Sequence, residues 1–285
     1  MDIKTLADFV ELARVRSFSQ AAAARHVTQP AFSRRVQALE TALGTPLVDR
    51  AQKHFQLTPA GERFLIHAQN MVALAERATD EVKSLSTHLQ KPVFISAPSY
   101  LSKTFFPSWY RQMQSAVPGL TMKISNQRGS GAVEDLHKAL ADFALIMQVE
   151  GVSACYSLEG LQSCRVGCDR VLAVRARHAR ENGNLLMHDQ GSYMSACAQA
   201  LLGKKGVRSA GVFESASTGL IKEMALAGFG MAVLPESLVE DELAQGYLLR
   251  VEGIKPRKAS ILLLRKGSSS HKKADKLWAA NLRPS

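Results

Sequence analysis

The N-terminal segment places apolar side chains at the repeat of an α-helix. A first helix over roughly 3–14 is predicted by residues at helical spacing: Leu6, Phe9, Val10, Leu12 and Ala13. A short second helix over Gln20–Arg25 follows, with Ser17 and Ser19 as N-cap candidates. A third helix begins after its predicted N-cap Thr28, has Pro30 in its first turn and ends at Gly44. Its buried stripe consists of Phe32, Val36, Leu39 and Leu43.

The second and third helices are separated by only three residues, His26–Thr28, which is the spacing of a helix-turn-helix. The small residues of Ala21–Ala24 let the second helix pack with its backbone close to a neighbour. Polar residues of the third helix lie off its apolar stripe, where Gln and Arg suit base edges and Ser suits phosphate. The candidate DNA-binding residues, including two from the segment that follows, are Ser19, Gln29, Pro30, Ser33, Arg34, Gln37, Arg50 and Lys53. A helical hairpin with a solvated face is the alternative.

A small β-wing and a long helix are predicted next. The runs Leu47–Arg50 and His54–Leu57 read as short strands joined by a polar turn. Thr58 and Pro59 then start a helix whose apolar residues step by four and three, as in a coiled coil: Phe64, Ala68, Met71, Ala75, Ala78, Val82, Leu85 and Leu89. A helix of ~45 Å with one apolar seam predicts a second copy of the chain as its partner. Packing against the chain's own domain is the alternative.

These motifs together resemble the LysR-type transcriptional regulators. The matching residues are SFSQAAAARHVTQPAFSRRVQALETALGTPLVDR, the wing and LTPAGERF. Val48 departs from the family, which usually has Phe there, and this is a change in packing. The resemblance implies binding to double-stranded DNA, with two recognition helices of a dimer in successive major grooves. It further implies a dimer of dimers and contact with RNA polymerase.

From residue 92 onward, short apolar strands alternate with amphipathic helices, which predicts a parallel α/β sheet. Strands are expected at 93–97, 120–124, 143–147, 171–174, 211–213, 230–234 and 260–264. Helices are expected at 99–116, 131–140, 193–202, 218–227, from Pro235 and at 273–281. The stretches ALADFALIMQ and STGLIKEMALAGFGMAVLPE carry the resemblance into this half. It implies a two-lobed effector domain similar to periplasmic solute-binding proteins.

The expected fold class is therefore an α+β multidomain chain. Its expected parts are a winged helix-turn-helix (1–58), a dimerisation helix and hinge (59–91) and an effector-binding domain (92–285) of two α/β lobes. The resemblance places lobe I at 92–161 and 267–285, and lobe II at 162–266. A small-molecule effector is expected between the lobes, at the carboxyl ends of strands and the starts of helices. The candidate residues are Ser99, Tyr100, Asn126, Gln127, Gln148, Tyr193, Ser217 and Thr218. Helix N-termini favour an anionic effector, although Ser217 and Thr218 also suit ordinary caps.

Charge favours an anionic partner without choosing between nucleic acid and an acidic ligand. The chain has 36 Lys and Arg against 25 Asp and Glu, a net charge of +11. No apolar run approaches the ~18 residues of a membrane span, and the start lacks the features of a signal peptide, so a cytoplasmic protein with no membrane partner is expected. The four cysteines form no CxxC pair and no metal-ligand spacing, so neither a metal nor a cofactor is expected.

Two other functions remain open at this stage. The stretches GSYMSACAQALL and STGLIKEMALAGFGMAVLPE, with the helix pair of SFSQAA…VTQPAFSRR, resemble a subgroup of LysR-type proteins that responds to hypochlorite through methionine oxidation. Oxidant sensing is therefore an alternative function. Its candidate redox residues are Met194, Met224, Met231, Cys164 and Cys168. A cytoplasmic solute-binding protein without DNA function is the alternative of another class. No enzyme is expected, because GxSxG, P-loop, HExxH and complete dinucleotide-binding motifs are absent from the sequence.

Overall fold

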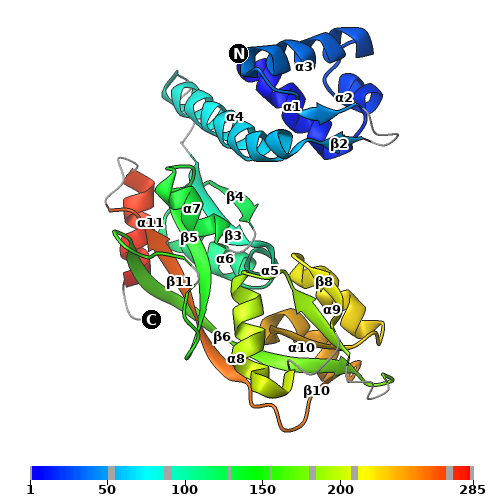
Figure 1. The fold of residues 1–285 in the computed structure, drawn as a ribbon. Coiled ribbons are helices and arrows are strands. Elements are labelled where there is room, and N and C mark those ends of the chain that lie inside the picture. Colours follow the sequence, from blue (N-terminus) through cyan, green and yellow to red (C-terminus); the bar gives the residue numbers. More distant parts are fainter. Residues whose placement is uncertain are drawn as a thin grey trace. The chain divides into compact units, whose positions relative to one another are not determined.

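A computed structural model of the chain describes residues 2–50, 55–86, 92–127, 130–154, 156–179, 184–206, 211–267 and 272–282 (Figure 1). The chain divides into two compact units, Met1–Leu89 and Gln90–Ser285. Each unit has its own hydrophobic core, and each is described by itself.

The N-terminal unit is a winged helix-turn-helix followed by a long helix. Its elements are α1 (Ile3–Val15), α2 (Phe18–Ala24), α3 (Gln29–Leu43), β1 (Val48–Asp49), β2 (Gln56–Leu57) and α4 (Pro59–Ser86). The two strands pair antiparallel. Helix α2 begins earlier than predicted because Ser17, rather than Ser19, is its N-cap. Thr28 is the N-cap of α3, as predicted, although its side chain makes no capping hydrogen bond.

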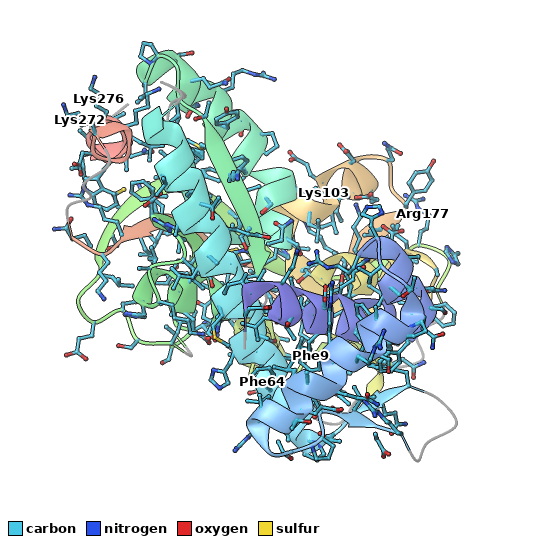
Figure 2. The ribbon with its side chains drawn as sticks, turned by 90° about the horizontal axis from the view of Figure 1, so that it is seen from above. Phe9, Phe64, Lys103, Arg177, Lys272 and Lys276 are labelled. Carbon is cyan, nitrogen blue, oxygen red and sulfur yellow. The ribbon has the colours of Figure 1, made fainter. Side chains whose placement is uncertain are left out.

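The first turns of α4 belong to the core of this unit. Ala68 is fully buried, and Phe64 and Met71 pack with it against residues of α1 and α3. Phe64 and Phe9 are neighbours in Figure 2, and their ring centroids lie 5.7 Å apart with the ring planes tilted by 47°. Ala68 is therefore buried within its own unit and is not open to a second copy. Phe64 and Met71 are only partly buried, and their place in a seam between two copies stays a prediction. An apolar repeat on one helix does not say which surface buries it.

The remaining seam positions lie beyond that core. Ala75 is half-buried, Ala78 is exposed and Val82 is 66% exposed. The backbone of Leu85 belongs to α4, and Leu89 lies outside the described residues. Two further apolar side chains of α4, Ile66 and Leu74, are also more than half exposed. In the first half of α4, the exposed apolar residues that the structure describes are therefore not the residues of the predicted seam.

The second unit is built on one mixed sheet. Its elements are β3 (Val93–Pro98), α5 (Ser99–Thr104), α6 (Phe106–Ala116), β4 (Met122–Gln127), α7 (Gly131–His137), β5 (Phe143–Val149), β6 (Gln162–Ala176), β7 (Leu185–His188), α8 (Tyr193–Gly206), β8 (Gly211–Ser215), α9 (Thr218–Leu226), β9 (Met231–Pro235), α10 (Glu236–Ala244), β10 (Leu248–Arg250), β11 (Arg257–Arg265) and α11 (Lys272–Leu282). The strand order is β4-β3-β5-β11-β6-β9-β7-β8, and β10 pairs with β6.

The sheet departs from the expected parallel one at its centre. Strand β11 lies antiparallel between β5 and β6, and β6 pairs antiparallel with β9. The sequence predicted only residues 171–174 of β6 and missed β7 and β10. Figure 1 shows β6 and β11 as long strands that run from one half of the unit into the other. The two halves of the unit therefore share these strands. The chain passes from one half to the other within β6 and β11, rather than at 161/162 and 266/267.

The C-terminal helix returns to the first half of the unit. The indole Nε1 of Trp109 on α6 donates to Oδ1 of Asn281 on α11 at 2.9 Å. Trp278 on the same helix stacks on Phe143 of β5, with ring centroids 6.2 Å apart. These contacts join α11 to α6 and to the start of β5.

Candidate DNA-binding surface and effector cleft

A buried carboxylate fixes the three helices of the helix-turn-helix. Asp8 on α1 has no exposed surface. Its Oδ1 accepts from Nε of Arg25 at 2.7 Å, and its Oδ2 accepts from Arg35 on α3 at 3.0 Å. A carboxylate buried this deeply needs such charged partners, because its desolvation is otherwise too costly. Arg35 therefore has a structural role, and its neighbour Arg34 faces away.

The outward face of α3 carries the predicted base-reading side chains. Gln29, Pro30, Arg34 and Gln37 are exposed and Ser33 is half-buried. No hydrogen bond or ion pair ties the Arg34 guanidinium to any described residue. This places free donors along one helix face, which is the arrangement that major-groove reading needs. Ser19 is exposed on α2, with its Oγ 3.1 Å from that of Ser17.

The wing is anchored by Glu40 of α3. Its Oε1 accepts from the backbone N–H groups of Leu47 and Val48 at 2.9 and 3.1 Å. Its Oε2 accepts from Arg50 at 2.8 Å. Arg50, expected to contact DNA, is thus held by an internal ion pair while its side chain remains 45% exposed. Lys53 lies outside the described residues.

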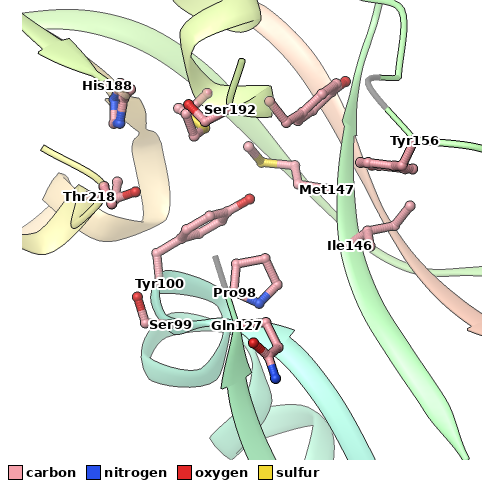
Figure 3. A pocket seen from close by; sticks show the side chains of 13 residues that line it. Pro98, Ser99, Tyr100, Gln127, Ile146, Met147, Tyr156, His188, Ser192 and Thr218 are labelled. Atoms are coloured by element: carbon pink, nitrogen blue, oxygen red, sulfur yellow. The ribbon is translucent and has the colours of Figure 1, made fainter. Parts of the chain in front are cut away.

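A cavity lies at the carboxyl ends of β3, β4 and β5, where the starts of α8 and α9 approach (Figure 3). Its volume is about 50 Å³. Five predicted effector residues line it: Ser99, Tyr100, Gln127, Tyr193 and Thr218. Three others do not. Asn126 precedes Gln127 and points to the other face, Gln148 follows the lining residue Met147 and lies in a separate concavity, and Ser217 caps α9 by accepting from Leu220 N.

The other eight lining residues were not predicted as effector contacts. Four of them carry side chains of chemical interest: Met147, Tyr156, His188 and Ser192. His188 ends β7, a strand the sequence did not reveal, so nothing marked it as a cleft residue. Ser192 directly precedes α8 and its Oγ accepts from Ser195 N, which is an N-cap signal that could have been found.

Burial shifts the titration of the polar groups in this cavity. His188 is 4% exposed, and its Nε2 donates to the carbonyl oxygen of Val233 at 2.9 Å. Burial lowers the pKa of His188, so the neutral ring is favoured. Burial likewise raises the pKa of Tyr100 well above its ordinary value, which keeps the phenol protonated. The cavity therefore offers neutral hydrogen-bonding groups.

Two contacts define the shape of the cleft. The Tyr193 hydroxyl at the start of α8 accepts from the backbone N–H of Val149 in β5 at 2.8 Å. This bond joins the two halves of the unit directly. Behind the lining residue Gln127, Asp135 of α7 is 8% exposed and accepts from both Ser96 and the Gln127 amide, at 2.7 and 2.8 Å. The Gln127 side chain is thereby held in one orientation.

The candidate redox residues are scattered. Met194 is 6% exposed and lines the cavity, whereas Met224 and Met231 are half-buried against the core. Cys164 and Cys168 both lie in β6, so their Cα atoms are roughly 13 Å apart at ~3.3 Å per residue. A disulfide needs a Cα–Cα distance of about 7 Å or less, so Cys164 and Cys168 cannot form one with each other, and a redox role for either thiol stays a prediction. Burial also raises the pKa of Cys164 to about 11.

None of the helices in the described part of the chain is long and apolar enough to cross a membrane. The same part of the chain holds no group of three His, Cys, Asp or Glu side chains that could bind a metal ion.

Family models match both units of the chain. The one described as "Bacterial regulatory helix-turn-helix protein, lysR family" matches residues 3–62, and "LysR substrate binding domain" matches residues 86–283. The HTH-type transcriptional regulator YjiE of Escherichia coli (strain K12) is 30% identical over 263 residues, covering 87% of this chain and 83% of the relative.

Solved structures with the same architecture include two of particular relevance. Vibrio fischeri DarR in complex with DNA is 28% identical, with a TM-score of 0.56 and coverage of 99% of both chains. Full-length HypT from Salmonella typhimurium, described as a hypochlorite-specific LysR-type transcriptional regulator, is 27% identical, with a TM-score of 0.55 and coverage of 98% and 97%.

Proposed function

This chain belongs to the LysR family of DNA-binding transcriptional regulators, and we propose that α3 reads its operator while a small effector in the cleft cavity controls the outcome. The observation that carries the proposal is the free polar face of α3. The bonds from Arg25 and Arg35 to the buried carboxylate of Asp8 hold this helix in place. The alternative of a solute-binding protein without DNA function leaves the helix-turn-helix match over residues 3–62 unexplained.

Arg34 is the residue with which to test DNA reading. Replacing Arg34 by Ala is expected to relax sequence preference at one base pair by ~1–3 kcal/mol, because a bidentate contact to a base edge is lost. The control is Arg14→Ala, which removes an exposed cation of α1 that pairs with Glu11 at 2.5 Å. Mobility shifts with single-base operator variants, at fixed salt, measure the sequence preference of both variants. If Arg34→Ala kept the sequence preference of the parent chain and lost no more operator affinity than Arg14→Ala, Arg34 would be excluded from the residues that read bases.

The exposed apolar residues of α4 support assembly into dimers. Ile66, Leu74, Ala78 and Val82 recur along the helix, and a second copy of α4 is the partner we propose for them. Leu74→Glu is expected to shift the sedimentation coefficient toward the monomer, whereas Ile3→Glu, at an exposed apolar position of α1, leaves it unchanged. Equal behaviour of the two variants contradicts the assignment. A dimer of dimers and contact with RNA polymerase follow the same proposal.

The cleft cavity is proposed to receive a small polar effector. Hydroxyls of Ser99, Ser192 and Thr218 line it, and the starts of α8 and α9 supply the positive ends of helix dipoles. An anionic effector would be held by these groups, since no Lys or Arg is among the described lining residues. Because the cavity is only about 50 Å³, effector binding is expected to open the Tyr193–Val149 contact.

A screen of metabolites by thermal shift tests this part of the proposal. Both tryptophans, Trp109 and Trp278, lie in the second unit, so their fluorescence reports its unfolding in the full chain. Thr218→Val is expected to abolish the shift given by a hit, and Ser108→Ala, on the exposed surface of α6, to retain it. Retention of the full shift by Thr218→Val counts against the cavity as the site.

Oxidant sensing is a second candidate, favoured by the position of Met194. Conversion of this buried cavity residue to the sulfoxide would place a polar group beside Tyr193. The HypT relative is described as hypochlorite-specific. Hypochlorite treatment is expected to change operator affinity in the parent chain but not in Met194→Leu. An identical response of both proteins would eliminate Met194 as the sensor.

A further inference from the structure

A second concavity of about 780 Å³ lies on the exposed face of the central strands, separate from the cleft cavity. We call it the crossover groove. It is formed by the end of β5 and the loop after it, the middle of β6 and the start of β11. Its polar lining residues are Gln148, Glu150, Ser153, Arg165, Lys258 and Ser260, together with Cys168, Asp169 and Arg170 of β6.

Strand register sets the order of these side chains. Ser260 of β11 pairs with Gln148 on one side and with Cys168 on the other, which makes one row across three strands. Lys258 pairs with Arg170 in the next row, and Leu262 pairs with Arg165 in the row on the opposite side. Paired residues project from the same face of a sheet, so the two ends of the groove are cationic and its middle is neutral and polar.

Two of the three cations at the ends have no counter-charge among the residues that the structure describes. Neither Arg165 nor Lys258 has an ion pair or side-chain hydrogen bond to any described residue, and both are exposed. Arg170 makes a weak pair with Glu236, at 3.5 Å.

Two carboxylates also belong to the groove. Asp169 is occupied, since its carboxylate accepts from the hydroxyl and the backbone N–H of Ser237 at 2.7 and 3.2 Å. Glu150 is exposed, and its negative charge would repel an anion in the groove.

We propose that the crossover groove binds a small dianion whose two anionic groups contact Arg165 and Lys258. These residues lie four strand positions apart in register, roughly 13 Å along the sheet. Because both side chains are long, a ligand whose anionic groups are about 5–10 Å apart can contact both of them. Gln148 and Ser260 hydrogen-bond its middle. Carboxylate and phosphate groups share this chemistry.

Such a ligand would act on the strands that both halves of the unit share. It would contact β5, β6 and β11 at once, and β6 and β11 run from one half into the other (Figure 1). Occupancy would therefore restrain the movement of one half against the other. The groove shares no described lining residue with the cleft cavity, so it would serve as a second input beside the effector proposed above. The two sites would be coupled through Val149, which lines the groove and whose N–H is bonded to Tyr193 of the cavity.

Cys168 provides a local reporter for the test. It is exposed at the centre of the groove, and cleavage after Arg165 and Arg170 isolates it from Cys164 in the tryptic peptide 166–170. The rate of its alkylation by N-ethylmaleimide is measured by mass spectrometry in the full chain, with adipate or inorganic triphosphate as probe. A local readout is required because polyanions also bind the helix-turn-helix.

Protection of Cys168 by either probe supports the proposal, and the more potent one identifies the ligand as a dicarboxylate or a phosphate compound. Lys258→Gln is expected to raise the half-protecting concentration by about tenfold, through loss of one charge-assisted contact. Glu150→Gln is expected to lower it. Lys276→Gln, at an exposed position of α11 visible in Figure 2, should leave it unchanged. Absence of protection by both probes, or equal protection in Lys258→Gln and Lys276→Gln, overturns the proposal.

Discussion

Asp8 offers the sharpest test of how the helix-turn-helix is held together. Its carboxylate is fully buried and bonds to Arg25 and Arg35, which come from the end of α2 and from α3. Asp8→Asn keeps the size of the side chain but removes its charge. The amide also replaces one acceptor by an N–H donor, which faces the donors of an arginine. The variant is therefore expected to loosen the packing of all three helices together.

The magnitude follows from the burial of each partner. Breaking a fully buried ion pair costs ~3–5 kcal/mol, because an uncompensated charge remains inside. Here the buried charge itself is removed, and the arginines that remain are 33% and 38% exposed and can turn toward water. The expected loss in unfolding free energy is therefore lower, about 2–3 kcal/mol. Glu11→Gln provides the control. It breaks the exposed Glu11–Arg14 pair of the same helix and should cost at most ~0.5 kcal/mol.

The two units can be monitored separately in one sample. Every tryptophan and tyrosine of the chain lies beyond Leu89, so aromatic fluorescence reports the second unit alone. Circular dichroism at the helix band reports both. During urea titration, Asp8→Asn should move the dichroism transition of the N-terminal unit to lower urea and leave the fluorescence transition in place. Operator affinity should fall with it. If Asp8→Asn were no more destabilising than Glu11→Gln, the contacts of Asp8 with Arg25 and Arg35 would not be what holds the three helices together.

Three further outcomes are expected. Gly61→Ala should destabilise the N-terminal unit by ~3 kcal/mol in urea titrations, because the added Cβ would lie 2.1 Å from the carbonyl oxygen of Leu47; a loss below that of an exposed-site alanine variant contradicts the contact. Ala139→Gly should stabilise the second unit by ~0.5–1 kcal/mol by fluorescence, since Ala139 has a φ of 56°; no gain argues against strain there. Because burial lowers the pKa of His188, the unfolded chain binds its proton more readily, so stability is full above the ordinary pKa of about 6.5 and falls as pH drops below it. His188→Gln should flatten this part of the pH profile, and an unchanged slope means that another group causes it.

The N-terminal unit was largely predictable because its signals are local. Cap residues, the three-residue turn and the 3.6-residue repeat act over a few positions, and they located α1, α2 and α3 closely. The partners of an apolar stripe are not local. Nothing in the spacing of Phe64 and Ala68 distinguishes the chain's own α1 from a second copy of α4. The pairing of Arg35 with Asp8 was invisible for the same reason, since 27 positions separate them.

The cleft was predictable where a strand and the helix after it were both recognised. Ser99 and Tyr100 follow β3 directly, and Thr218 begins α9, so their placement followed from topology. His188 and Tyr156 come from a short unrecognised strand and from a loop, so no periodic pattern pointed to them. Gln148 illustrates a different limit. Its place at the end of β5 was right, but alternation along the strand turned it away from Met147 and into the crossover groove.

The position of α4 constrains how a signal could act on the proposed DNA-reading face of α3. Its first turns share one core with α1 and α3, through Phe64, Ala68 and Leu39, while Leu74 and Val82 further along remain exposed. Closely packed residues resist sliding, because loss of a buried contact costs more than thermal energy supplies. The direction of α3 is therefore fixed relative to the start of α4. A contact between two copies through the exposed stripe would consequently set the separation of the two α3 helices, and a change in operator spacing would require the pair of α4 helices to move, not the helix-turn-helix to rearrange.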